Sequence, residues 1–210
     1  MKMHTLFSKL TWVILATFLT TVSFNSIAEE LTAPQKLVKD ASDTMLTSLE
    51  DNKAELESDP DKIYKLVENQ LTPYFDFEKM TKLALGKNWR GLDKKQQAQF
   101  VEEFRLLLIR TYSTAMLEYS DQQINMLPFR DDLSRKRVNV PMEIIQPSGP
   151  SIPMALSLYE NDSNEWKVYD VRIDGISLVT NYRSSFATEI RNKGADQLIA
   201  DLAQRNAKLK

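Results

Sequence analysis

The chain has 210 residues with 27 basic and 29 acidic side chains, a single histidine and no cysteine. This length suits one domain with a full-sized core. The lack of cysteine excludes disulfides, thiol nucleophiles and thiolate metal sites, and the slightly negative charge argues against nucleic-acid binding. Since the histidine is His4, inside a segment typical of a cleaved export signal, the mature chain is expected to lack imidazole chemistry too. The composition therefore favours a binding protein over an enzyme.

The N-terminus has the pattern of a secretory signal. Lys2 and Lys9 precede an apolar run over residues 10–22, and Ser26 and Ala28 place small side chains at the −3 and −1 positions. The run is shorter than the roughly 20 apolar residues of a membrane-spanning helix, which is the alternative interpretation. Cleavage is expected after Ala28, leaving 210 − 28 = 182 residues (29–210) as a single exported domain.

The first half of the mature chain predicts helices and the second half predicts strands. Apolar residues at helical spacing indicate helices over residues 34–57, 60–71, 77–85, 94–119, 176–192 and 195–207. Asp59, Asp76 and the pair Asp93 and Gln96 are expected to cap three of them. Apolar residues alternate over 138–144, 152–158 and 166–173, with a weaker strand over 122–127.

Two local features qualify these strands. The apolar phase slips near Tyr169 and Asp170, which predicts a β-bulge. Pro141 and Pro153 predict that their strands are edges or are bulged there. The expected fold is α+β, a curved antiparallel sheet of about four strands wrapped by helices.

Candidate sites are few. Five glycines form no phosphate-binding loop. Asp170 and Asp174 are either an acid/base pair or, as we favour, helix caps and solvent-facing groups. Arg183 is predicted inside the apolar stripe of its helix, with Tyr182 at the edge. Its guanidinium is expected either to form an internal ion pair or to bind an anion such as a phosphate. No catalytic residue and no metal ligand is predicted.

Three segments resemble the MlaC family, the periplasmic phospholipid-binding or toluene-tolerance proteins. The segment over residues 169–183, YDVRIDGISLVTNYR, followed by Phe186, resembles the C-terminal signature of the family. Residues 85–89, LGKNW, and residues 71–76, LTPYFD, agree with it in order and spacing. The similarity covers nearly the whole mature chain.

The resemblance implies a fold of the nuclear-transport-factor (NTF2) or cystatin type with a deep apolar pocket. It implies a glycerophospholipid held by its acyl tails as cargo, with no cofactor, and a monomer. It further implies a shuttle between an outer-membrane lipoprotein–porin complex of the MlaA type and an inner-membrane ABC transporter with an MCE-domain ring of the MlaD type. That shuttle maintains the lipid asymmetry of the outer membrane.

The pocket wall is predicted from the alternation of the strands, although the opposite face of the sheet is the alternative. Arg183 is the candidate for the headgroup. Two other functions remain open: an Asp/Tyr-dependent enzyme of the NTF2 type acting on an apolar substrate, which needs a buried carboxylate in the pocket, and a non-lipid binding module with a filled core. The predicted lipid-binding residues are Phe104, Leu108, Tyr112, Val140, Met142, Ile144, Met154, Leu156, Leu158, Tyr169, Val171, Ile173, Val179, Tyr182 and Arg183.

Overall fold

The computed structural model describes residues 30–118 and 122–208, so the predicted export signal and its cleavage site lie outside the described residues. Residues Leu31–Lys210 form one compact unit. Its helices are α1 (Ala33–Asp51), α2 (Lys53–Ser58), α3 (Pro60–Gln70), α4 (Phe77–Leu85), α5 (Lys94–Glu118), α6 (Leu178–Lys193) and α7 (Ala195–Lys208). Its strands are β1 (Gln123–Met126), β2 (Arg137–Ile145), β3 (Ile152–Glu160), β4 (Trp166–Ile173) and β5 (Ile176–Ser177). The short 3₁₀ turns are η1 (Thr72–Tyr74), η2 (Gly86–Gly91) and η3 (Leu133–Arg135).

The helices begin where their capping residues predict. The carboxylate of Asp76 accepts a hydrogen bond from the backbone N–H of Lys79 at 2.8 Å, which starts α4. Asp93 and Gln96 exchange backbone-to-side-chain hydrogen bonds of 3.0 and 2.8 Å before α5, which confirms the capping box. Gly86 ends α4 with a φ of 55°, a conformation that L side chains rarely adopt.

Two predicted helices differ from the structure at their ends. The helix expected over residues 34–57 is interrupted at Asn52, where α1 gives way to α2. The helix expected from Ile176 begins at Leu178, because Ile176 and Ser177 first form β5 and pair with the end of β4. The hydroxyl of Ser177 then accepts a hydrogen bond from the backbone N–H of Thr180 and caps α6.

Within the described residues the sheet has five antiparallel strands in the order β1-β2-β3-β4-β5, which confirms the α+β class. Ser157 pairs with Asp170, whereas the next residue, Leu158, pairs with Val168. Tyr169 is therefore the extra residue of a bulge at the predicted place.

The two strand prolines lie in interior strands, so the expectation that these strands are edges is wrong. The reason is local. The carbonyl of Pro141 accepts from the N–H of Leu127, just past the end of β1, and that of Pro153 accepts from the N–H of Asp174, just past the end of β4. Since the nitrogen and carbonyl of one residue point to the same side of an antiparallel strand, each proline nitrogen faces a neighbour that has already ended.

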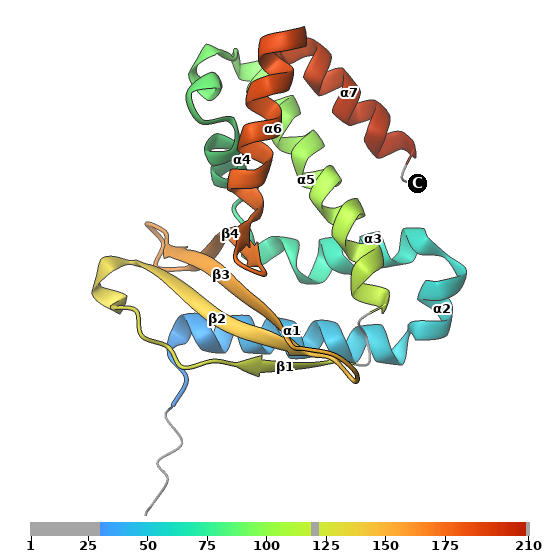
Figure 1. The fold of residues 1–210 in the computed structure, drawn as a ribbon, viewed down its shortest axis with the longest axis vertical. Coiled ribbons are helices and arrows are strands. Elements are labelled where there is room, and N and C mark those ends of the chain that lie inside the picture. The colour runs from blue at the N-terminus through green and yellow to red at the C-terminus, as the bar shows by residue number, and fades with distance from the viewer. Residues whose placement is uncertain (1–29, 119–121, 209–210) are drawn as a thin grey trace, which may run out of the picture. The chain divides into compact units, whose positions relative to one another are not determined.

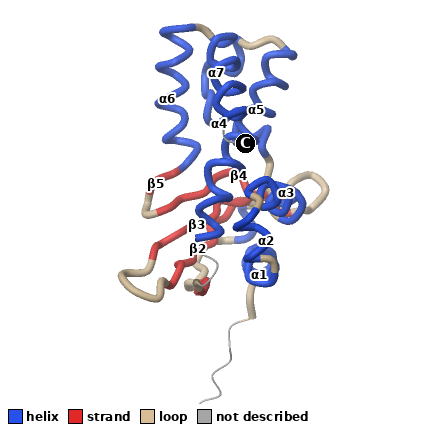
Figure 2. Tube along the Cα trace, turned by 90° about the vertical axis from the view of Figure 1, so that its right-hand side faces the viewer, coloured by secondary structure: helices blue, strands red, loops and turns tan. Residues whose placement is uncertain are grey.

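Helices cover the sheet in two groups. Figures 1 and 2 show α4, α5, α6 and α7 upright beside one another, with the strands crossing below them and α1 running along the sheet at the opposite end. The upright helices enclose a core of aromatic and aliphatic side chains that includes Phe100, Phe104 and Phe186. A second cluster joins α1 to the inward face of the sheet. No helix in the described part of the chain is long and apolar enough to cross a bilayer.

Candidate functional site

A cavity of about 450 Å³ lies between the inward face of the sheet and helices α1, α3 and α5. This volume falls within the roughly 300–1,000 Å³ that small-molecule sites occupy. Its walls are formed by the sheet, by α1 and η1, and by α5. Its lining comprises Leu37, Val38, Ala41, Ser42, Met45, Leu46, Leu49, Val67, Leu71, Thr72, Tyr74, Phe75, Phe77, Met80, Leu108, Ile109, Tyr112, Ser113, Ala115, Met116, Gln122, Ile124, Met142, Ile144, Ile152, Met154, Leu156, Val168, Val171, Ile173 and Leu178.

The sheet lies over a filled core at one end and over the cavity at the other. Val140 and Leu158 are 0% exposed, because side chains of the second core cluster surround them. Leu156 and Met154 lie two and four residues before Leu158 on β3 and point to the same face, yet both remain partly exposed. These two side chains border empty space, so the alternation of β3 runs from packed core into the cavity wall.

The cavity wall is almost wholly apolar. No charged side chain lines it among the described residues. The hydroxyl of Ser113, one of its few polar groups, already donates to the carbonyl of Ile109 at 2.6 Å. Such a wall offers burial to a hydrocarbon and gives an ion no counter-charge.

Tyr112 brings a phenol to this wall from α5. The phenol of Tyr182 is its polar neighbour. Burial, followed by the neighbouring Tyr182, raises the pKa of Tyr112 to about 12, so its hydroxyl keeps its proton at physiological pH. Tyr112 is therefore an uncharged part of the wall.

Of the predicted lipid-binding residues, the structure brings eight together around the cavity. These are Leu108, Tyr112, Met142, Ile144, Met154, Leu156, Val171 and Ile173. They come from α5, β2, β3 and β4, and the sheet residues share the face that the alternation selected. Their contact with a lipid stays a prediction.

The other predicted residues lie outside the cavity lining. Val140 and Leu158 belong to the filled part of the sheet core. Phe104 and Val179 are packed among the upright helices, where Phe104 contacts the ring of Tyr182 at 5.0 Å between centroids. Tyr169, the bulge residue, instead packs its ring against Tyr159, 6.0 Å away.

Arg183 does not point into the apolar face of α6, so that prediction is wrong. Ile176, which the prediction counted in the stripe, lies in β5. The inward stripe of α6 passes through Val179, Tyr182 and Phe186, and Arg183 is exposed beside it. The Nε of Arg183 donates to the carbonyl of Leu83 at 2.7 Å, near the C-terminal end of α4. The guanidinium thus has a partner on α4, away from the cavity.

Asp170 is buried, as the enzymatic alternative requires, but its position is that of a capping group. Its carboxylate accepts from the hydroxyl of Ser177 at 2.7 Å and from the backbone N–H of Val179 at 3.1 Å. Asp170 is absent from the lining of the cavity, and Asp174 is exposed in the turn before β5. Among the described residues no three His, Cys, Asp or Glu side chains are grouped to hold a metal ion.

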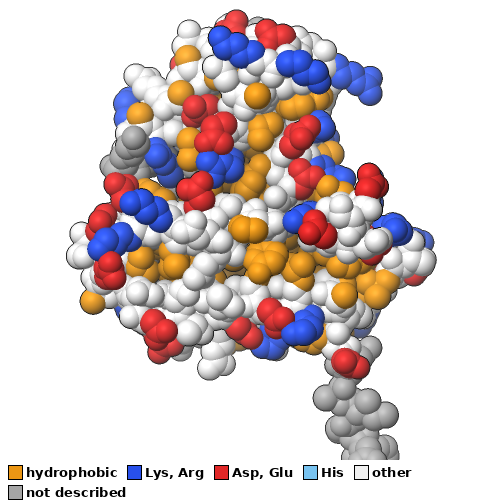
Figure 3. Space-filling model, turned by 180° about the vertical axis from the view of Figure 1, so that it is seen from behind, with side chains coloured by type: hydrophobic (Ala, Val, Ile, Leu, Met, Phe, Trp, Pro, Cys, Tyr) orange, Lys and Arg blue, Asp and Glu red, His pale blue; other side chains and the backbone are white. Residues whose placement is uncertain are grey.

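Sequence reasoning missed the contribution of α1. Its inner face lines the cavity with Leu37, Ala41, Met45 and Leu49. The fourfold spacing of these residues predicts the apolar stripe of a helix, but a stripe against a filled core has the same spacing. Figure 3 shows hydrophobic side chains gathered in a band across the middle of one face of the compact unit, with charged side chains above and below.

The chain resembles known proteins over most of its length. The profile of a family described as "MlaC protein" matches residues 39–204. Over 198 residues the chain is 27% identical to the intermembrane phospholipid transport system binding protein MlaC of Haemophilus influenzae, covering 92% of each chain. Over 164 residues it is 30% identical to toluene tolerance protein ttg2D of Pseudomonas putida, covering 78% of this chain and 75% of that protein.

A solved structure agrees in fold. The phospholipid-binding protein from Ralstonia solanacearum, determined in complex with a phospholipid, superimposes with a TM-score of 0.77 and 31% identity. The similarity covers 83% of this chain and 97% of that protein. The family resemblance that the sequence motifs indicated is confirmed.

Proposed function

Because the chain belongs to the MlaC family, we propose that it is a phospholipid carrier whose cavity holds the acyl tails of its cargo. The observation that carries this proposal is the apolar cavity of about 450 Å³ between the sheet, α1 and α5. The phospholipid in the related Ralstonia solanacearum structure supports it. The proposal also holds that the protein acts without catalysis and without a cofactor.

The energetics of hydrocarbon burial explain what such a carrier does. Two acyl chains carry about 30 methylenes, and each buried methylene contributes roughly 0.8 kcal/mol, which gives a gross value on the order of 20 kcal/mol. A protein that buries the tails removes this penalty from the aqueous path. The same value makes spontaneous release slow, so the cargo should leave only when a docked partner offers another apolar surface.

The proposal extends to the place and the partners of this activity. We propose that residues 1–28 are a signal peptide cleaved after Ala28 and that residues 29–210 act in the periplasm as a monomeric single domain. The partners would be an outer-membrane complex of the MlaA type and an inner-membrane transporter of the MlaD type. The name of the Haemophilus influenzae relative, a component of an intermembrane transport system, supports this assignment.

The first test is native mass spectrometry of the mature protein purified from a bacterial periplasm, with lipid analysis of its organic extract. We expect a mass shift of one phospholipid and diacyl species in the extract. Leu156→Glu should abolish the shift in a folded protein, because an empty cavity can hydrate the new carboxylate whereas an acyl tail would strip that water. Ala200→Glu, which adds the same charge on the exposed side of α7, should remain loaded.

A protein that is bare and also takes up no lipid from vesicles would overturn the carrier proposal. Full loading of folded Leu156→Glu would instead place the tails elsewhere.

A further inference from the structure

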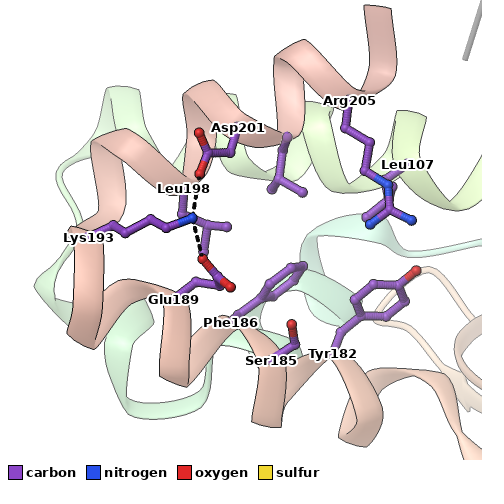
Figure 4. Close-up of a pocket in the computed structure, with 10 residues that line it drawn as sticks. Leu107, Tyr182, Ser185, Phe186, Glu189, Lys193, Leu198, Asp201 and Arg205 are labelled. Carbon is purple, nitrogen blue, oxygen red and sulfur yellow. Dashed lines mark hydrogen bonds and ion pairs between the residues drawn. The ribbon is translucent and has the colours of Figure 1, made fainter. Parts of the chain in front are cut away.

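A second, smaller pocket of about 220 Å³ opens between α6 and α7. Its floor is apolar and consists of Leu107, Phe186, Leu198 and Leu202, which are all buried. Figure 4 shows polar side chains at its two ends. It is therefore a groove with a hydrocarbon floor and two distinct polar ends.

At one polar end the charged side chains form ion pairs with one another. The ammonium of Lys193 lies 3.0 Å from a carboxylate oxygen of Glu189 and 3.1 Å from one of Asp201, so the three side chains form a closed bridge between α6 and α7 (Figure 4). The two carboxylates raise the pKa of Lys193, which keeps it charged. A ligand gains nothing by displacing this arrangement.

The other end carries donors without acceptors. The guanidinium of Arg205 and the hydroxyl of Tyr182 point toward one another in Figure 4. Burial raises the pKa of Tyr182, and the positive charge of Arg205 partly opposes this rise. Within the described residues Arg205 has no ion pair. The hydroxyl of Tyr182 lies at this end of the groove, where it can donate to a ligand. Ser185 adds a third donor group, a hydroxyl, at the rim.

From this arrangement we infer that the groove between α6 and α7 is a second ligand site, which takes a small monocarboxylate with an apolar end. The planar fork of Arg205 matches the two oxygens of a carboxylate, and the Tyr182 hydroxyl supplies one further donor. The apolar end of the ligand lies on Phe186 and Leu202.

Size and charge set the ligand class. At about 30 Å³ for each water-sized group, 220 Å³ holds roughly seven groups, which suits an amino-acid-sized molecule and excludes a long acyl chain. The carboxylates of Glu189 and Asp201 at the far end disfavour a dianion such as phosphate. The inference does not depend on the lipid cargo, so its failure would leave the carrier proposal untouched.

The test is titration of the mature protein with isovalerate, a branched monocarboxylate of the size that the groove holds, followed by NMR of the protein's methyl and aromatic groups. Isovaleramide, which has the same apolar end without the carboxylate, is the matched ligand control. We expect saturable shifts at Phe186 and Leu202 with the acid and none with the amide. Since an exposed ion pair contributes up to about 1 kcal/mol, Arg205→Gln should weaken binding about fivefold.

Two further variants separate a binding site from a general charge effect. Arg191→Gln removes the same charge from the exposed side of α6, where its guanidinium contacts Thr188, and should bind like the wild type. Tyr182→Phe should weaken binding while leaving the fold intact. Equal binding of the amide, equal shifts with inorganic phosphate, or an unchanged affinity in Arg205→Gln would each overturn the inference.

Discussion

Leu156 and Leu158 offer a direct test of whether the sheet covers a hollow or a filled interior. They lie on one strand and one face, two residues apart, and differ in their surroundings. Leu158 is 0% exposed within a packed cluster, whereas Leu156 borders the cavity. Truncation to alanine should therefore have different costs at the two sites in lipid-free protein.

The expected magnitudes follow from what each side chain loses. Leu158→Ala leaves a new void in close-packed surroundings and should cost about 2–5 kcal/mol of unfolding free energy. Leu156→Ala enlarges a space that already exists, so only part of the transfer energy is lost and the cost should be about 1 kcal/mol. The difference between the two variants should exceed about 1 kcal/mol.

The assay is urea denaturation of delipidated protein, with the midpoints compared at a common slope. Delipidation is essential, because a bound tail would stabilise the folded state and would fill the space beside Leu156. Equal losses in the two variants would mean that Leu156 is packed as tightly as Leu158. In that case the cavity would not exist in solution and the filled-core module would be the better description.

Three further predictions concern Arg183, the phenols of Tyr112 and Tyr159, and Arg105. Arg183→Gln should lower the unfolding free energy by about 1 kcal/mol in thermal denaturation, through loss of its hydrogen bond to α4, and should leave lipid loading unchanged. Burial raises the pKa of both Tyr112 and Tyr159 to about 12. Since phenols titrate near pH 10 in the unfolded chain, the contribution of these two protonated phenols to the unfolding free energy is complete below about pH 10 and is lost toward pH 12. Phenolate absorbance and denaturation at these pH values should show this loss. Arg105→Met should cost about 1–2 kcal/mol in urea denaturation, because Arg105 links Glu68 on α3 to α5.

Each of these three predictions has a contrary outcome. Reduced lipid in a stable Arg183→Gln protein would return Arg183 to the headgroup. Titration of all the tyrosines near pH 10 in folded protein would contradict the burial of the two phenols. An Arg105→Met variant as stable as the wild type would show that the ion pairs of this residue are balanced by their desolvation.

Local chemistry explains why much of the fold is legible in the sequence. Asp76, Asp93 and Gln96 act on backbone groups three residues away, so their capping role needs no tertiary information. The bulge at Tyr169 is visible because one extra residue inverts the apolar phase of its strand. In each case the signal and its structural effect lie within a few positions of each other.

The residues of the site are harder to predict from the sequence, for two physical reasons. Periodicity reports which face of an element is apolar and says nothing of what that face meets, so Leu156 at a cavity and Leu158 in a core look the same. The members counted in a stripe also matter. Ile176 belongs to β5 and not to α6, and without it the apolar stripe of α6 is centred on the side of Tyr182 and leaves Arg183 outside.

The volume of the cavity bears on how the protein is loaded. At about 30 Å³ for each water-sized group, 450 Å³ accommodates roughly fifteen groups, about one acyl tail, whereas a diacyl lipid brings about 30 methylenes. Loading with both tails therefore requires the walls to separate. The element best placed to move is α1, because its inner face lies on the empty cavity and its outer face is exposed. Ser48 of α1 accepts a side-chain hydrogen bond of 2.7 Å from Gln70 of α3, which such a movement would break.

Hydrogen exchange can locate this movement. In lipid-free protein the amides of α1 should exchange faster than those of α5, since α1 packs through one face only, whereas α5 lies between the cavity and the upright helices. Loading should slow α1 most strongly. The amides of α7, a helix that contributes nothing to the cavity lining, are the internal control and should not respond. If β1 and β2 respond while α1 does not, the sheet is the moving wall. The hydrogen bond between Ser48 and Gln70 would then belong to a wall of the cavity that stays in place during loading.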